Sequence, residues 1–179
     1  MVIDELIKTL QIWIDSLQHY DEQSFLVKPS DGSWSIGQVY LHLLNETSFF
    51  LSQARTCLCS DNNSNQFASP HGLQMLENNS FPDERIEGPP SNLFLQQPTS
   101  KNTILFGLHR LCSDITEIKE LLKQSSFRGK SKHPGLQYLD SQQWCQFAEM
   151  HLRHHLRQKT RIDNHLATIA NKENQNRGC

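Results

Sequence analysis

The chain has 179 residues, of which 36% are hydrophobic and 20% charged, and its formal net charge is −2 at pH 7. This length suits a single domain that buries a core of its own without disulfides or metal ions as a condition of folding. The near-neutral charge balance excludes the clustered basic surface that nucleic-acid binding normally needs, so we expect no nucleic-acid partner.

The cysteines and the apolar pattern indicate the compartment. Five cysteines at irregular spacing (Cys57, Cys59, Cys112, Cys145 and Cys179) predict neither a disulfide framework nor a thiolate zinc site. The first residues do not have the pattern of a secretory signal, and no apolar stretch reaches the roughly 18 residues of a membrane span. We therefore expect a cytoplasmic protein in a reducing environment, without a membrane partner.

Two amphipathic helices are predicted in the first third of the chain. Residues 1–19 have apolar side chains at steps of three and four, which form one stripe. A second helix is predicted over residues 35–57, where Ser35 and Gln38 have the spacing of a capping box.

Two more helices are predicted in the second half. Residues 101–123 have a wide apolar face and an outward charged face. Asp140 with Gln143 predicts the start of a fourth helix, which we expect to run to about residue 162. Its Arg153 and Arg157 are interpreted as a solvated outer face.

These elements predict an all-α fold, a four-helix bundle formed by residues 1–165 as one domain. Residues 60–100 are rich in Asn, Ser and Pro, with only a brief apolar pulse near Leu73 and Leu76, and are expected to form a long loop. Residues 166–179 are expected to be a polar, disordered tail. No strand pair is predicted.

Histidines occupy the apolar stripe of the fourth helix. Steps of three and four from Trp144 pass through His151 and His155, where a plain bundle would have leucine. Two imidazoles at positions i and i+4 can bind one metal ion, although this spacing also arises on exposed helices. His154 points in a neighbouring direction, toward the edge of the bundle.

A third histidine, His42, lies on the inward face of the second helix. Alone, it is more typical of a hydrogen-bonded core residue than of a ligand. Three inward histidines without buried partners would be costly, and a shared cation would satisfy one nitrogen of each ring. On the residues alone, the metal site and the ordinary core remain equally supported.

Two motifs resemble those of a known family. "WSIGQVYLH", residues 34–42, and "HLRHH", residues 151–155, resemble the DinB/YfiT-like superfamily of metal-dependent enzymes. The stretch "KHPGLQYLDSQQWCQFAEMHLRHHLRQ" is similar to a bacterial subgroup of unknown function. The resemblance implies a four-helix bundle with one long crossover connection, here residues 60–100, and a homodimer.

The resemblance also implies the chemistry. It implies a divalent metal ion, zinc or nickel, held by His42, His151 and His155, with His154 not a ligand. Some relatives use a low-molecular-weight thiol as a cosubstrate. We therefore hypothesise an ion that activates water or such a thiol against a small electrophilic substrate, as in a thiol S-transferase or a hydrolase.

No general base is compelling in the sequence. Glu46, one turn after His42, is a candidate catalytic residue, as are His133 in "KHPG" and Glu149. Solvated side chains are the competing interpretation for Glu46 and His133. Trp34 is interpreted as a packing residue at the helix entry. The rival function is a non-catalytic bundle, in which the metal stabilises the fold or a dimer.

Overall fold

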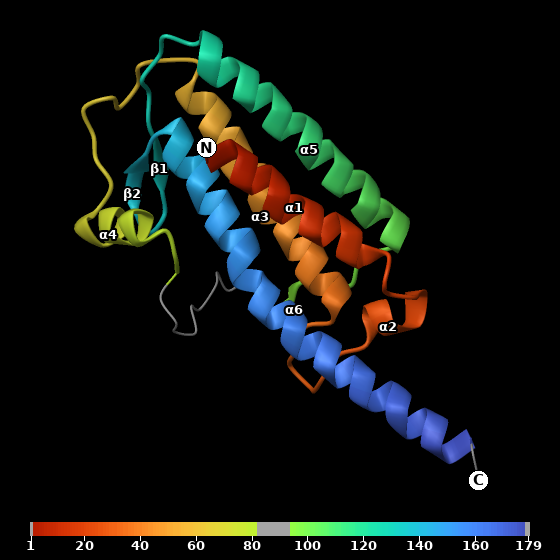
Figure 1. The fold of residues 1–179 in the computed structure, drawn as a ribbon. Helices are drawn as coiled ribbons and strands as arrows, with labels where there is room; N and C mark the ends of the chain where they lie inside the picture. Colours follow the sequence, from red (N-terminus) through yellow and green to blue (C-terminus); the bar gives the residue numbers. More distant parts are fainter. Residues whose placement is uncertain (1, 82–93, 178–179) are drawn as a thin grey trace.

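Four long helices form the body of the molecule in a computed structural model, which describes residues 2–81 and 94–177. They are α1 (Val2–Leu17), α3 (Ile36–Cys57), α5 (Lys101–Gln124) and α6 (Ser141–Arg177). α6 packs between α1 and α3, and α5 packs against the same two helices on the other side. Figure 1 shows α1 and α6 running in one direction, and α3 and α5 in the other. The all-α prediction is confirmed.

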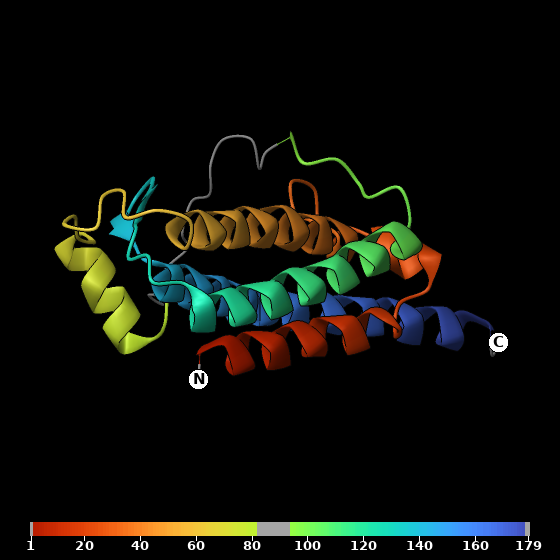
Figure 2. The ribbon, with the colours of Figure 1, turned by 90° about the horizontal axis from the view of Figure 1, so that it is seen from above.

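Because α3 and α5 are parallel, the connection between them must cross the length of the bundle, as Figures 1 and 2 show at its two described ends. The connection contains a short helix, α4 (Pro70–Asn78). Ser69 caps its start, and Asn79 ends it in the left-handed conformation, with φ of 49°. The expectation of a loop without regular structure is therefore wrong for α4. Residues 82–93 lie outside the described part of the chain.

The predicted capping hydrogen bonds form at the starts of α3 and α6. Ser35 and Gln38 form the full capping box of α3. Asp140 accepts from the Gln143 amide, and the Gln143 side chain accepts from the Asp140 amide, both at 2.9 Å. Gln38 Nε2 also donates to the Leu95 carbonyl at 2.6 Å, which fixes the returning end of the connection against the start of α3.

A buried network joins the helices in the middle of the bundle. The indole of Trp13, which is fully buried, donates from Nε1 to the Leu152 carbonyl of α6 at 3.2 Å. Tyr40 of α3 donates to the Trp13 carbonyl at 2.8 Å, and their rings meet edge to face. These bonds fix the axial register of α1, α3 and α6.

Two smaller elements were not predicted. A short helix, α2 (Glu22–Leu26), follows α1, and an antiparallel hairpin of β1 (Ser131–His133) and β2 (Gln137–Leu139) precedes α6. The prediction of no strand pair is therefore wrong. The hairpin was missed because strands of three residues are too short to show a period of two in the sequence. The hairpin lies beside α4 in Figure 1, and Ala68 bridges to Gln137.

The C-terminal end of α6 extends past the ends of the other helices (Figure 1). Residues 166–177 are therefore helical, where a disordered tail was expected. Leu166 continues the stripe of Ile162, and Asp163 accepts from Tyr20 at 2.6 Å. No glycine or proline interrupts the helix before Gly178.

Arg157 is exposed as expected, and the side chain of Arg153 is 42% exposed, but Arg153 also belongs to a network that was not predicted. It forms an ion pair with Glu149 at 2.8 Å and donates to the Asn79 carbonyl at the end of α4. Glu149 is 7% exposed and also accepts from Thr9 of α1 at 3.0 Å. This network connects α1, α4 and α6.

Replacing Arg153 by Met should lower the free energy of unfolding by about 2 kcal/mol, because the buried Glu149 carboxylate loses its charged partner. Urea denaturation followed by circular dichroism measures the change. Arg161→Met is the matched control, since Arg161 is exposed on the same helix. The control should change stability by no more than about 0.5 kcal/mol. Equal effects of the two substitutions would contradict the network.

Candidate metal centre

The antiparallel packing of α3 on α6 brings three histidines together. His42 Nε2 lies 3.2 Å from His151 Nε2, and His155 Nε2 lies 3.2 Å from the same His151 atom. One ring nitrogen from each of the three lies within 4.8 Å of the others. The structure thus groups the three residues that the sequence singled out as ligands. Their binding of a metal stays a prediction.

The start of α3 positions His42. The capping box fixes where the helix begins, and His42 follows two turns later on the face toward α6. The Trp34 ring packs against the His42 ring, with centroids 5.0 Å apart. Trp34 is therefore more than a packing residue at the helix entry, because it also forms one wall of the histidine group.

Aromatic rings surround His151. The Phe50 ring of α3 lies edge to face with it at 5.4 Å, and the Phe81 ring lies 6.3 Å away. His151 Nδ1 is buried and has no hydrogen-bond partner in the described part of the chain. Apart from the Nε2 contacts within the cluster, this ring is held by packing against aromatic side chains.

His155 is held differently. Its Nδ1 lies 2.8 Å from Gln158 Oε1, one turn further along α6. The Nε2 atom of His155 can then be unprotonated and directed at His151. Gln158 was not among the residues predicted to act at the site, although it follows His155 at the i+3 spacing of neighbours on one helix face.

Burial keeps these imidazoles neutral. Desolvation, with a smaller contribution from His155, lowers the pKa of His42 to about 3. Desolvation lowers the pKa of His155 to about 4, and that of His151 falls well below 6.5 through burial and the neighbouring histidines. At neutral pH the three rings are uncharged, and their lone pairs are available as ligands.

The geometry fits a transition-metal ion. Three Nε2 lone pairs facing one another repel, and a single proton on His151 could serve only one good hydrogen bond. Ligands at about 2.0–2.1 Å in a tetrahedral zinc site are separated by about 3.3–3.4 Å. Both measured Nε2–Nε2 distances are 3.2 Å, close to that value.

The group offers three protein ligands of unequal burial. His42 is buried, whereas His151 and His155 are half-buried. In residues 2–81 and 94–177, no fourth His, Cys, Asp or Glu belongs to the cluster. A tetrahedral ion held by these three ligands would have one coordination position not filled by a His, Cys, Asp or Glu of the described residues, as in catalytic zinc sites.

Glu46 lies one turn after His42 on α3 and is half-buried. Burial raises the pKa of its carboxyl. Within the described ranges it has no hydrogen bond or ion pair, so no partner commits it to a structural role. It does not belong to the ligand group.

His133 and His154 lie outside the group. The His133 ring packs on Trp144 and Phe147, and its Nδ1 accepts from the amides of Gly135 and Leu136 at 3.1 Å. These contacts give His133 a structural role in the hairpin turn, and a catalytic role for it stays a prediction. The His154 ring instead packs against Phe81 and His155.

Comparison with known proteins identifies the family of the chain. Residues 4–158 match the family model of the DinB superfamily. No curated protein and no solved structure matches the chain. In the described ranges, no helix is both long and apolar enough to cross a membrane.

Replacing His155 by Ala should weaken zinc binding by at least about 100-fold, because it removes one of three ligands, a larger loss than that of an outer hydrogen bond. Competition against a chromophoric chelator measures the affinity, and elemental analysis measures the metal content of the purified protein.

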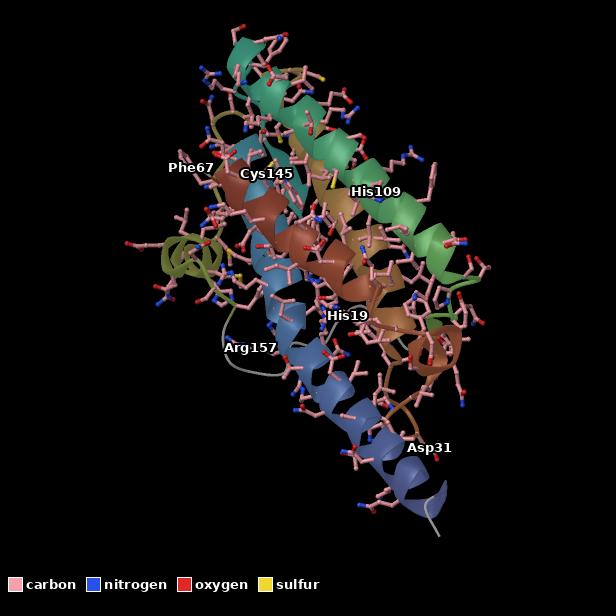
Figure 3. All side chains as sticks on the ribbon, turned by 45° about the vertical axis from the view of Figure 1, so that its right-hand side comes forward. His19, Asp31, Phe67, His109, Cys145 and Arg157 are labelled. Atoms are coloured by element: carbon pink, nitrogen blue, oxygen red, sulfur yellow. The ribbon has the colours of Figure 1, made fainter. Side chains whose placement is uncertain are left out.

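Two control substitutions accompany this test. His154→Ala changes the adjacent residue of the same helix. His109→Ala changes an exposed residue of α5, on the side of the bundle away from α6 (Figure 3). Both variants should bind zinc like the wild type. Equal, negligible metal in all four proteins would contradict the metal site.

Replacing His133 by Asn should reduce the loss of stability at acidic pH, because Asn keeps an acceptor for the turn amides but does not titrate. Burial lowers the pKa of His133 from 6.5 to about 4. As the pH falls from 6.5 toward 4, the unfolded state binds the proton first, so the wild type loses stability in that window.

The expected difference is small, because the His133 ring is only partly buried. Between pH 7 and pH 5 the wild type should lose about 1 kcal/mol more than His133→Asn. Urea denaturation with a metal chelator present measures this, since the three clustered histidines then titrate equally in both proteins. Identical pH profiles would refute it.

Proposed function

Since the chain belongs to the DinB superfamily, we propose that it is a metal-dependent enzyme acting on a small electrophilic substrate. His42, His151 and His155 would hold one divalent cation, zinc or nickel. The observation that supports this most is the convergence of three neutral imidazoles, in which His151 Nε2 lies 3.2 Å from the Nε2 atoms of both His42 and His155.

A cation bound there would lower the pKa of water or of a low-molecular-weight thiol, which supplies a nucleophile at neutral pH. The three histidines provide neutral ligands, so the site keeps its positive charge. The rings of Trp34, Phe50 and Phe81 lie against the histidines and exclude water from their sides.

Glu46 is the proposed general base. It would take the proton from the water or thiol as that group attacks the electrophilic atom, and return it to the leaving group. Its half-buried position raises the pKa of its carboxyl, which makes it a better proton acceptor than a solvated glutamate.

The proposal also includes a small-molecule substrate and assembly of the chain into a homodimer.

One observation favours a second function. The ligands come from two helices, so an ion would link α3 to α6 and could stabilise a non-catalytic bundle or dimer. Structural zinc sites are usually saturated by four protein ligands. A set of three ligands, without a fourth among the described residues, favours catalysis over this alternative.

Replacing Glu46 by Gln should reduce turnover by about 100- to 10,000-fold without loss of metal, because the general base is removed and the ligands are kept. The assay combines the zinc- or nickel-loaded protein with a panel of low-molecular-weight thiols and electrophilic acceptors, and separately with activated esters. Turnover is compared with that of the chelated protein.

Glu77→Gln is the matched control, an exposed glutamate on α4. It should retain full activity. An absence of metal-dependent turnover across the panel, in a protein that binds zinc tightly, would favour the structural role. Unchanged turnover in Glu46→Gln would remove Glu46 from the mechanism.

A further inference from the structure

The three clustered histidines differ in what holds their second ring nitrogen. In the described ranges, only His155 has a hydrogen bond from Nδ1, to Gln158 Oε1 at 2.8 Å. The corresponding atom of His151 is buried without a partner. His42 is contacted on its ring by Trp34 and makes no hydrogen bond there outside the cluster.

The hydrogen bond determines the tautomer of His155. A ring that offers a lone pair from Nε2 carries its hydrogen on Nδ1. The Gln158 carbonyl oxygen accepts from that N–H, which favours this tautomer over the other. The 2.8 Å distance is typical of a well-formed bond.

The hydrogen bond also limits rotation of the ring. The residues are three apart on α6, so their side chains share one face of the helix. The His155 ring is further enclosed by His42, His151 and His154, with centroids 4.6 to 5.4 Å away. With Gln158 on Nδ1, its Nε2 is directed at His151.

We propose that Gln158 is the positioning residue of this site: it holds His155 in the tautomer and orientation that a metal ion requires. This inference rests on the proposed metal site and goes beyond it, because it assigns a role to a residue that binds neither metal nor substrate. Partners of this kind typically change metal affinity by about 10- to 100-fold.

The amide also has an electronic consequence. A carboxylate accepting from Nδ1–H makes an imidazole a stronger donor, whereas a neutral amide leaves it weaker. With Gln158 as its partner, His155 donates less charge than it would with a carboxylate partner, and an ion held by the site would be the stronger Lewis acid. A glutamate at this position would bind the ion more tightly and leave it less acidic.

The test uses the full-length protein with Zn²⁺ or Co²⁺ as the probe. Gln158→Leu removes the acceptor at similar volume, and Gln158→Glu keeps it and adds a charge. Gln146→Leu is the matched control, a half-buried glutamine on the same helix that donates to the Leu76 carbonyl at 2.7 Å and does not contact the histidines.

Zinc affinity from chelator competition and the visible absorption of the Co²⁺ form are the readouts. Gln158→Leu should weaken zinc binding 10- to 100-fold and shift the Co²⁺ bands. Gln158→Glu should bind zinc at least as tightly as the wild type, and Gln146→Leu should match the wild type in both readouts.

Zinc affinity of Gln158→Leu within twofold of the wild type would overturn the inference and leave the metal site intact. Equal weakening in Gln146→Leu would also overturn it, since the effect would then follow from loss of helix stability. A wild type that binds neither ion would overturn the proposed function as well, so the two failures are distinguishable.

Discussion

The antiparallel contact between α3 and α6 is the interaction on which the rest of the structure depends. Its register places His42 opposite His151 and His155, and a shift of one residue along either helix would separate the Nε2 atoms. Large side chains hold that register: Phe50 stacks on Trp144 two turns from the histidines. On the other side of α6, Trp13 bonds to the Leu152 carbonyl. The site is therefore as rigid as the core around it.

This contact also has a cost. Three imidazoles occupy positions on the helix faces where leucine would contribute to the core. One of their ring nitrogens, His151 Nδ1, is buried and has no partner among the described residues. A bundle selected only for stability would not keep this arrangement. Such local conflicts between a residue and its surroundings are expected at functional sites. A shared cation would satisfy the three Nε2 atoms that face one another, although it would not provide a partner for His151 Nδ1.

The sequence predicted what depends on local structure. The capping residues Ser35 and Asp140 set the starts of α3 and α6 through bonds within one turn, and apolar periodicity placed His42, His151 and His155 on inward faces. It did not predict α4, the hairpin or the helical course of residues 166–177, because tertiary contacts decide these short or polar segments. Tertiary contacts also decide the roles of individual side chains that the sequence did not predict. Arg153 pairs with the buried Glu149, and Phe81, from a segment without apolar periodicity, lies against His151.

X-ray absorption spectroscopy of the zinc-reconstituted protein tests the central claim most directly. The structure predicts three imidazole nitrogens at about 2.0–2.1 Å together with one or two light ligands that are not from histidine, the signature of an open site. Sulfur ligands, or a shell filled by four protein groups, would contradict an open three-histidine centre. Zinc that remains hydrated and unbound would contradict the site altogether.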